Sequence, residues 1–245
     1  MDLRELGTLG GFFALRTSGD TAPPEGGDAP GVPLARVYAG DLEPLTRRVD
    51  LVAARHTPPE RRVAASIAHL GLAARLWSIA LGGAVLHGSV PPLAPERLHW
   101  SPGLTTPDDL WLELPGPGEG QPAAPATVEA LREAVQYAHL VPLARAMRQE
   151  TAVSPRLLWG NAGSALAAAV RQIDDWARGT GDAGAARRAE SLAAGLFAHP
   201  DLSGTVRGPG RRRTSCCLYY RAPRGGLCGD CVFDRPPSSP RASGG

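Results

Sequence analysis

Apolar residues recur at helical spacing along most of this chain of 245 residues. Leu42, Leu45, Val49 and Val52 lie three or four positions apart, so they share one face of a helix. This pattern predicts a helix over residues 42–55. A short amphipathic helix is predicted over residues 2–16, at the start of the chain.

The longest apolar run extends from residue 57 to about residue 86 and is rich in Ala and Leu. Thr57 and Glu60 form a candidate capping box at its start. The second half of the run is apolar on all sides, which is typical of a buried helix. Gly71 or the pair Gly82–Gly83 is predicted to divide the run into two helices.

Helical periodicity returns in the second half of the chain. Residues 127–140 are amphipathic, and Pro142 is predicted to kink or end their helix. Ser154, directly before a proline, is a candidate N-cap for a helix that ends near Gly179. A further helix is predicted from Asp182 to about residue 198.

A few short segments predict strands instead. Residues 96–100 (ERLHW) and 109–114 (DLWLEL) alternate apolar and polar positions and favour a hairpin. Another short strand is predicted near residues 34–39. Residues 17–33 and 115–126 are rich in Gly and Pro, which predicts loops.

These elements predict an α+β fold that is mainly α-helical, with a few short strands. We divide the chain into an N-terminal helix and flexible loop (1–33), a mainly helical domain (34–205), a small C-terminal module (206–235) and a disordered tail (236–245). The module has too few regularly spaced apolar residues to fold by hydrophobic burial alone, so a bound metal centre is expected to hold it.

Charge and the N-terminus narrow the class of protein. The formal net charge is +2, which argues against binding to nucleic acid, although all 26 basic residues are arginines. The first residues lack the apolar segment and cleavage site of a signal peptide. We therefore expect a cytoplasmic protein, where thiols stay reduced, and nothing in the sequence indicates association with a membrane.

All four cysteines of the chain lie close together, at Cys216, Cys217, Cys228 and Cys231. A C-x-x-C pair can present two sulfurs to one metal, and four thiolates suit either a tetrahedral zinc ion or an iron–sulfur cluster. Adjacent residues project in different directions, so both reaching one zinc ion is awkward, whereas a two-iron cluster is wider. The spacing therefore favours [2Fe–2S] and leaves a structural zinc site open; a disulfide between adjacent cysteines would be strained.

Five arginines flank the cysteines, and they change the interpretation of the low net charge. They are Arg211, Arg212, Arg213, Arg221 and Arg224. Cations beside a cluster favour the thiolates and the reduced form, and so raise the potential. The same run could instead attract an anionic substrate or an acidic electron donor, or be only a solvated basic surface.

The segment CCLYYRAPRGGLCGDC, preceded by basic residues, closely resembles the C-terminal signature of the FhuF-type ferric-siderophore reductases. Residues 157–173 (LLWGNAGSALAAAVRQI) resemble the WGN-containing helix of that family, and the similarity extends back to about residue 58. The resemblance implies that Cys216, Cys217, Cys228 and Cys231 bind a [2Fe–2S] cluster. It further implies one-electron reduction of siderophore-bound Fe(III) and release of Fe(II), with no catalytic residue beyond the cluster.

The partners implied by the resemblance are a ferric siderophore and an electron donor that the sequence does not identify. Two other functions stay open on the residues alone. One is a non-catalytic helical interaction protein with a structural zinc site made of the four cysteines. The other is a [2Fe–2S] electron carrier or iron sensor.

Overall fold

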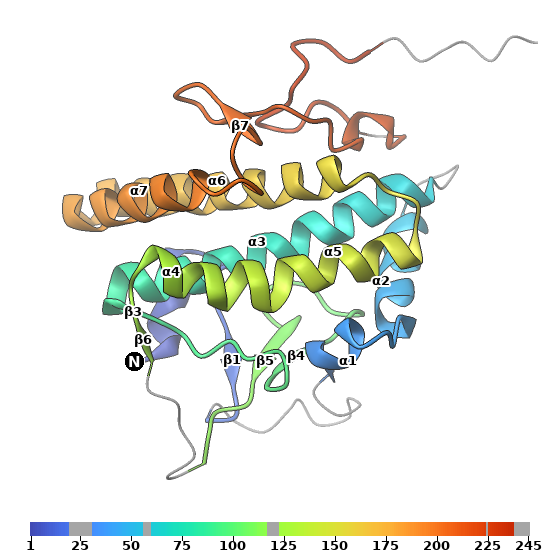
Figure 1. Ribbon diagram of the computed structural model, residues 1–245. Helices are drawn as coiled ribbons and strands as arrows, with labels where there is room; N and C mark the ends of the chain where they lie inside the picture. The colour runs from blue at the N-terminus through green and yellow to red at the C-terminus, as the bar shows by residue number, and fades with distance from the viewer. Residues whose placement is uncertain (20–30, 56–59, 117–122, 224, 238–245) are drawn as a thin grey trace, which may run out of the picture.

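The computed structural model describes all residues except 20–30, 56–59, 117–122, 224 and 238–245. Figure 1 shows a mainly helical molecule in layers, which confirms the predicted fold class. The helices, including 3-10 and π segments labelled η, are η1 (Leu3–Leu9), α1 (Leu34–Tyr38), α2 (Glu43–Ala53), α3 (Arg61–His87), α4 (Val128–Leu131), η2 (Arg132–Leu140), α5 (Val141–Glu150), α6 (Pro155–Thr180), α7 (Ala183–Phe197) and η3 (Tyr219–Arg221).

The strands are short and form three small sheets. They are β1 (Arg16–Thr17), β2 (Val32–Pro33), β3 (Ser89–Val90), β4 (Leu98–Trp100), β5 (Leu110–Leu112), β6 (Ala124–Pro125), β7 (Val206–Arg207) and β8 (Arg212–Arg213). The largest sheet has the order β1-β5-β4-β2, and β4 and β5 pair antiparallel with His99 opposite Trp111. This pairing confirms the predicted hairpin.

Helix α3 is the centre of the fold. It packs against α2 and α6, and α7 packs beside α6. The four-stranded sheet lies on the side of α3 that faces away from α6 (Figure 1). By length and composition alone α3 could cross a membrane, but 78% of its most apolar window is buried inside the protein. Its apolar surface therefore forms the core.

The prediction that glycines divide this helix was wrong, because α3 continues unbroken from Arg61 to His87. A Cβ at Gly82 would lie 2.8 Å from the ring of Phe13, and a Cβ at Gly83 would lie 2.5 Å from Pro91. These glycines therefore serve close packing rather than a break. The predicted capping residue Thr57 lies outside the described residues.

Other helix boundaries follow local signals. Ser154 accepts a hydrogen bond from the Leu157 amide at 3.1 Å and caps α6, as predicted. Asp182 caps α7 in the same way through the Ala185 amide. The C-cap of α6 lies two residues later than predicted, because Gly181 and not Gly179 takes the left-handed conformation.

One prediction near another boundary was wrong, and a second was wrong in one of its two alternatives. Residues 34–38 form the helix α1 and not a strand, since Leu34 and Val37 are spaced to bury one helical face directly after Pro33. Pro142 does not end its helix either. The preceding residues widen into the π-helix η2, and α5 continues through the proline near its first turn, where the missing N–H is tolerated.

His139 lies fully buried in η2 and is hydrogen-bonded as a neutral imidazole. Its Nε2 lies 2.6 Å from the Leu93 carbonyl oxygen, and its Nδ1 lies 2.9 Å from the Tyr38 hydroxyl. Because Nε2 must donate to a carbonyl, Nδ1 accepts from the hydroxyl. Burial lowers the pKa of His139 from 6.5 to about 4.

This shift predicts that acid destabilises the helical domain before most carboxylates titrate. Between pH 6.5 and about pH 4, His139 binds a proton in the unfolded chain but stays neutral in the folded chain. The free energy of unfolding therefore falls as the pH drops through this range. At pH 5 the loss from His139 is about 2 kcal/mol. Urea unfolding followed by circular dichroism at pH 7, 6 and 5 measures it. His139→Gln should make the slope shallower and leave the part that comes from buried His69, whose pKa is lowered to about 3. An unchanged slope would contradict the assignment.

Candidate metal centre

The cysteines lie in a C-terminal segment that covers one side of α6 (Figure 1, orange to red). It begins with an antiparallel hairpin in which Val206 of β7 pairs with Arg213 of β8. The chain then passes through Cys216 and Cys217, turns at η3 and returns with Cys228 and Cys231. We call residues 206–235 the cysteine module, with the bounds that the sequence predicted.

Two glycines of α6 let Thr205 and the cysteine module that follows it approach closely. A Cβ at Gly163 would lie 2.8 Å from the Thr205 Cβ, and a Cβ at Gly160 would lie 3.3 Å from the Ser215 Cβ and overlap its hydroxyl. The Ser215 hydroxyl donates to the Arg156 carbonyl at 3.2 Å. The small residues of the WGN-containing helix therefore form the surface on which this segment docks.

A chain of buried hydrogen bonds connects α3, α6 and the cysteine loop. The side-chain amide of Asn161 (Nδ2) donates to the Ser66 carbonyl at 2.9 Å, and the Ser66 hydroxyl donates to the Cys217 carbonyl at 2.7 Å. Arg213 Nη2 donates to Asn161 Oδ1 at 2.5 Å. The backbone that carries Cys217 is thus fixed directly to the helical core.

The second cysteine pair is fixed from the same helix. The Ser164 hydroxyl donates to Asp230 Oδ2 at 2.5 Å, and the Arg213 amide donates to the Asp230 carbonyl at 2.9 Å. The Cys231 amide closes the C-x-x-C turn by donating to the Cys228 carbonyl at 3.0 Å. Asp230 therefore orients the turn that presents both sulfurs.

The four thiols are free, and their surroundings suit thiolate ligands. Cys217 Sγ lies 3.5 Å from Cys228 Sγ. The Leu218 amide donates to Cys216 Sγ at 3.3 Å, and the Phe233 amide donates to Cys231 Sγ at 3.5 Å. Such N–H···S contacts stabilise the charged form of sulfur.

The thiols differ in exposure and in acidity. Cys217 and Cys231 are buried, at 5% and 7% exposed, whereas Cys216 and Cys228 are half-buried. The hydrogen bond from the Cys228 thiol lowers the pKa of Cys217 to about 6, and the same bond raises the pKa of Cys228. Burial raises the pKa of Cys216.

The sulfurs are not gathered around one point. Among the described residues, no three His, Cys, Asp or Glu side chains are grouped as ligands of a single metal ion. Four thiols, a close pair and backbone N–H donors to the sulfurs nevertheless fit a two-iron cluster, which takes two cysteines per iron. The donor set therefore matches the predicted cofactor.

Comparison with known proteins agrees with this chemistry. The segment belongs to the class of iron–sulfur modules, since residues 213–233 match the family described as the FhuF 2Fe-2S C-terminal domain. The match spans all four cysteines and identifies the cofactor as a [2Fe–2S] cluster. The search of curated proteins returned no match to the chain. The individual ligand roles of Cys216, Cys217, Cys228 and Cys231 stay predictions.

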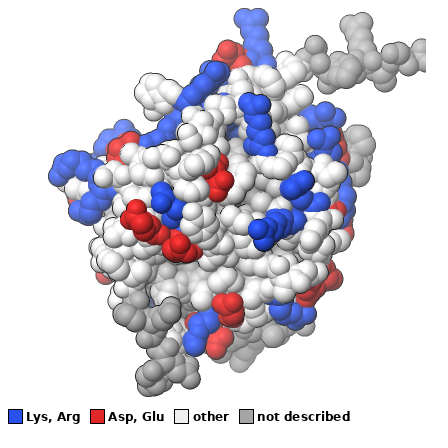
Figure 2. Space-filling view, in the orientation of Figure 1, with Lys and Arg blue, Asp and Glu red and all other residues white. Residues whose placement is uncertain are grey.

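The flanking arginines differ in their surroundings. Three are paired with acids: Arg211 with Glu190 at 2.5 Å, Arg212 with Asp234 at 2.7 Å and Arg221 with Glu60 at 2.8 Å. Basic side chains project from the top of the molecule in Figure 2, where Figure 1 places the module, with acidic ones beside them. Arg213 is buried, and Arg224 lies outside the described residues.

The sequence missed the residues that dock the module. Ser66, Asn161 and Asp230 had no assigned role, although Asn161 belongs to the WGN segment whose resemblance was noted. Gly160 and Gly163 stand one helical turn apart in the sequence, a spacing of small residues that allows another segment to approach closely. The partner that approaches, however, is visible only in the fold.

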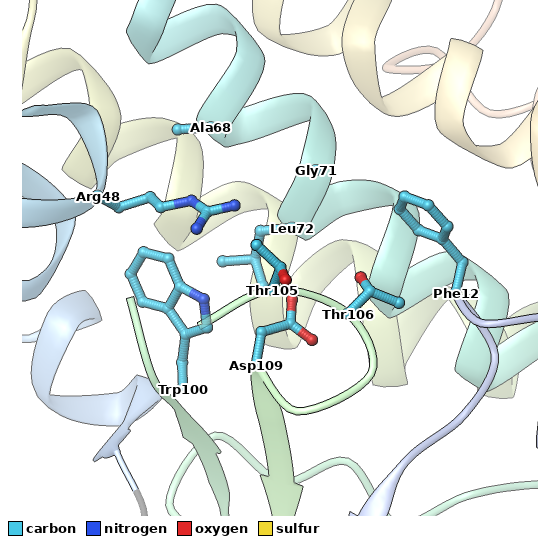
Figure 3. Close-up of a pocket in the computed structure, with 9 residues that line it drawn as sticks. All are labelled: Phe12, Arg48, Ala68, Gly71, Leu72, Trp100, Thr105, Thr106 and Asp109. Carbon is cyan, nitrogen blue, oxygen red and sulfur yellow. The ribbon is translucent and has the colours of Figure 1, made fainter. Parts of the chain in front are cut away.

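A separate pocket of about 280 Å³ lies on another face of α3. Figure 3 shows Arg48, Trp100 and Asp109 directed into it, with Ala68 and Leu72 of α3 as part of the wall. The Asp109 carboxylate is held by buried Arg75 at 2.9 Å. The volume is below the range of about 300–1,000 Å³ that drug-sized ligands occupy, and no cysteine lines the pocket.

Proposed function

We propose that this protein is a cytoplasmic ferric-siderophore reductase. The observation that carries the proposal is the match of residues 213–233 to the FhuF 2Fe-2S C-terminal domain, on a module docked to a helical domain. We further propose a ferric siderophore as substrate, an external one-electron donor as partner and no nucleic-acid partner.

When bound by Cys216, Cys217, Cys228 and Cys231, the cluster would supply one-electron chemistry between the external donor and siderophore-bound Fe(III). Ferrous iron is a poorer match for the hard oxygen donors of a siderophore, so it dissociates. The balance is one electron per iron. No protein acid or base is required.

The chain's own residues bind and shield the electron-transfer centre. Cys217 and Cys231 are buried against the helical domain, whereas Cys216 and Cys228 are half-buried at the surface. The half-buried pair supports electron transfer at the outer edge of the module. A siderophore approaching that edge would not need the pocket of Figure 3, which is too small to enclose it.

Reoxidation by substrate tests the reductase. Anaerobically purified protein, reduced with dithionite and freed of excess reductant, is mixed with ferric hydroxamate and ferric catecholate siderophores in a stopped-flow instrument. We expect the visible absorption of the oxidised cluster to return, with one Fe(II) trapped by a ferrous chelator per cluster oxidised. The matched control is the same siderophore loaded with redox-inert Ga(III).

The other functions predict different results. A carrier or sensor would keep its cluster reduced with every ferric siderophore and reoxidise only with a protein partner or another oxidant. A structural zinc protein would be colourless and contain one zinc ion per chain. Either result would overturn the reductase.

A further inference from the structure

Arg213 differs from the other arginines around the cysteines because its side chain is removed from water. It is 0% exposed and is among the largest fully buried side chains described. It lies beneath the cysteine loop, between that loop and helix α6. Burying a guanidinium without compensation is costly, so its position calls for an explanation.

Neutral groups hold the Arg213 guanidinium in place. Nη2 donates to Asn161 Oδ1 at 2.5 Å, and Nε donates to the Ser215 carbonyl at 3.2 Å. Nη1 is buried and has no hydrogen-bond partner. Among the described residues no carboxylate pairs with Arg213, although Arg211, Arg212 and Arg221 each have one.

Two kinds of anionic group lie near this charge: the buried Asp230 carboxylate, which is bonded to the Ser164 hydroxyl, and the thiolates of the cysteine loop. Ser215, whose carbonyl contacts Arg213, directly precedes Cys216 and Cys217. The nearby His69 adds no second positive charge, because burial, together with the charge of Arg213, lowers its pKa to about 3.

We propose that Arg213 is a positioning residue that sets the reduction potential of the cluster. Reduction adds one negative charge to a centre that is already anionic, and a fixed cation in a water-excluded site stabilises the more negative form. The inference deepens the proposed reductase, since it names the residue that tunes the electron-transfer centre, but it requires only that the cluster bind.

Burial is what separates Arg213 from its neighbours. Arg221 is 47% exposed and neutralised by Glu60, so solvent and salt screen its field. It stands four residues after Cys217, and Arg213 stands three residues before Cys216. Arg221 is therefore a matched control for charge and for distance along the chain.

The test compares midpoint potentials of full-length holoprotein by redox titration monitored by electron paramagnetic resonance. For Arg213→Gln we expect the equilibrium constant for one-electron reduction to fall at least tenfold, a drop of about 59 mV. Arg213→Lys keeps the charge and should stay within threefold of wild type. Arg221→Gln should also stay within threefold.

Salt provides a second measurement. The difference between wild type and Arg213→Gln should persist in 1 M salt (a Debye length of about 3 Å), because a buried charge is screened little. Equal potentials for wild type and Arg213→Gln, or a difference that salt abolishes, would overturn the proposal. If Arg213→Gln does not retain the cluster, Arg213→Lys decides: a fall of tenfold or more in its equilibrium constant for one-electron reduction also overturns the proposal.

This outcome is independent of the reductase test. A wild-type protein that binds the cluster but fails to reduce any siderophore would refute the proposed function and still allow the potentials to be compared. A shift in potential without siderophore reduction would leave Arg213 as a tuning residue of a carrier.

Discussion

Replacing Cys217 by serine is expected to abolish the visible absorption of the [2Fe–2S] cluster and to leave the helical domain folded. Cys217 is the most acidic of the thiols with a resolved shift, and its sulfur lies 3.5 Å from that of Cys228. A serine hydroxyl stays protonated near neutral pH and is a poor ligand for iron in place of a thiolate. Losing one of four ligands therefore removes the cluster or leaves it labile.

The helical domain should survive because its stability comes from elsewhere. The buried cluster of apolar side chains is built from residues that precede the cysteines, above all those of α3 and α6. The bond from Ser66 reaches the Cys217 carbonyl, which serine retains. Helical circular dichroism and its melting curve should match wild type, apart from the stabilisation that the bound cluster adds.

Absorption spectra, iron analysis and circular dichroism of the purified variant check this prediction. Ser215→Ala is the matched control, since it changes one side-chain atom in the same loop without touching a thiol. It should keep the wild-type spectrum. A Cys217→Ser protein with wild-type absorption and iron content would show that Cys217 is not a ligand.

Adding a side chain at Gly163, on the face of α6 that contacts the C-terminal segment, is expected to loosen the cysteine module without unfolding the helices. In Gly163→Val the first added carbon would lie 2.8 Å from the Thr205 Cβ, closer than two such carbons approach. Thr205 is held by a bond from its hydroxyl to the Leu202 carbonyl at 2.6 Å, so the strain falls on the docked segment. Overpacking of this kind costs about 1–3 kcal/mol.

We expect faster loss of the cluster from Gly163→Val than from wild type when both are challenged with an iron chelator. Gly179→Val is the matched control, because Gly179 lies in the same helix and a Cβ there meets nothing within 4 Å. Valine also has a better helix propensity than glycine, so this control should be neutral or slightly stabilising. Equal chelator rates in the two variants would contradict the close docking.

The local features of the fold could be predicted because their causes lie within a few residues. Ser154 and Asp182 cap helices through their own side chains, and the hairpin β4–β5 follows from short alternating segments. The error in α3 arose because a distant residue decides. Gly82 does not break α3, because Phe13, far away in the sequence, packs into the space that a side chain at Gly82 would fill.

The same division holds at the metal centre. The spacing of Cys216, Cys217, Cys228 and Cys231 pointed to a [2Fe–2S] cluster, because ligand type and loop length are local properties that the cofactor itself requires. The arginines looked alike in the sequence, since charge alone carries no record of burial.

By itself, then, the amino-acid sequence determined the helix caps, the hairpin, the mainly helical class and the cofactor chemistry. Only the tertiary structure decided which arginine is buried and how the module is held. Ser66, Asn161 and Arg213 are separated by 95 and 52 residues and meet through hydrogen bonds that cross three segments. Contacts over such distances depend on the packing of α3 against α6, which no short window of sequence records.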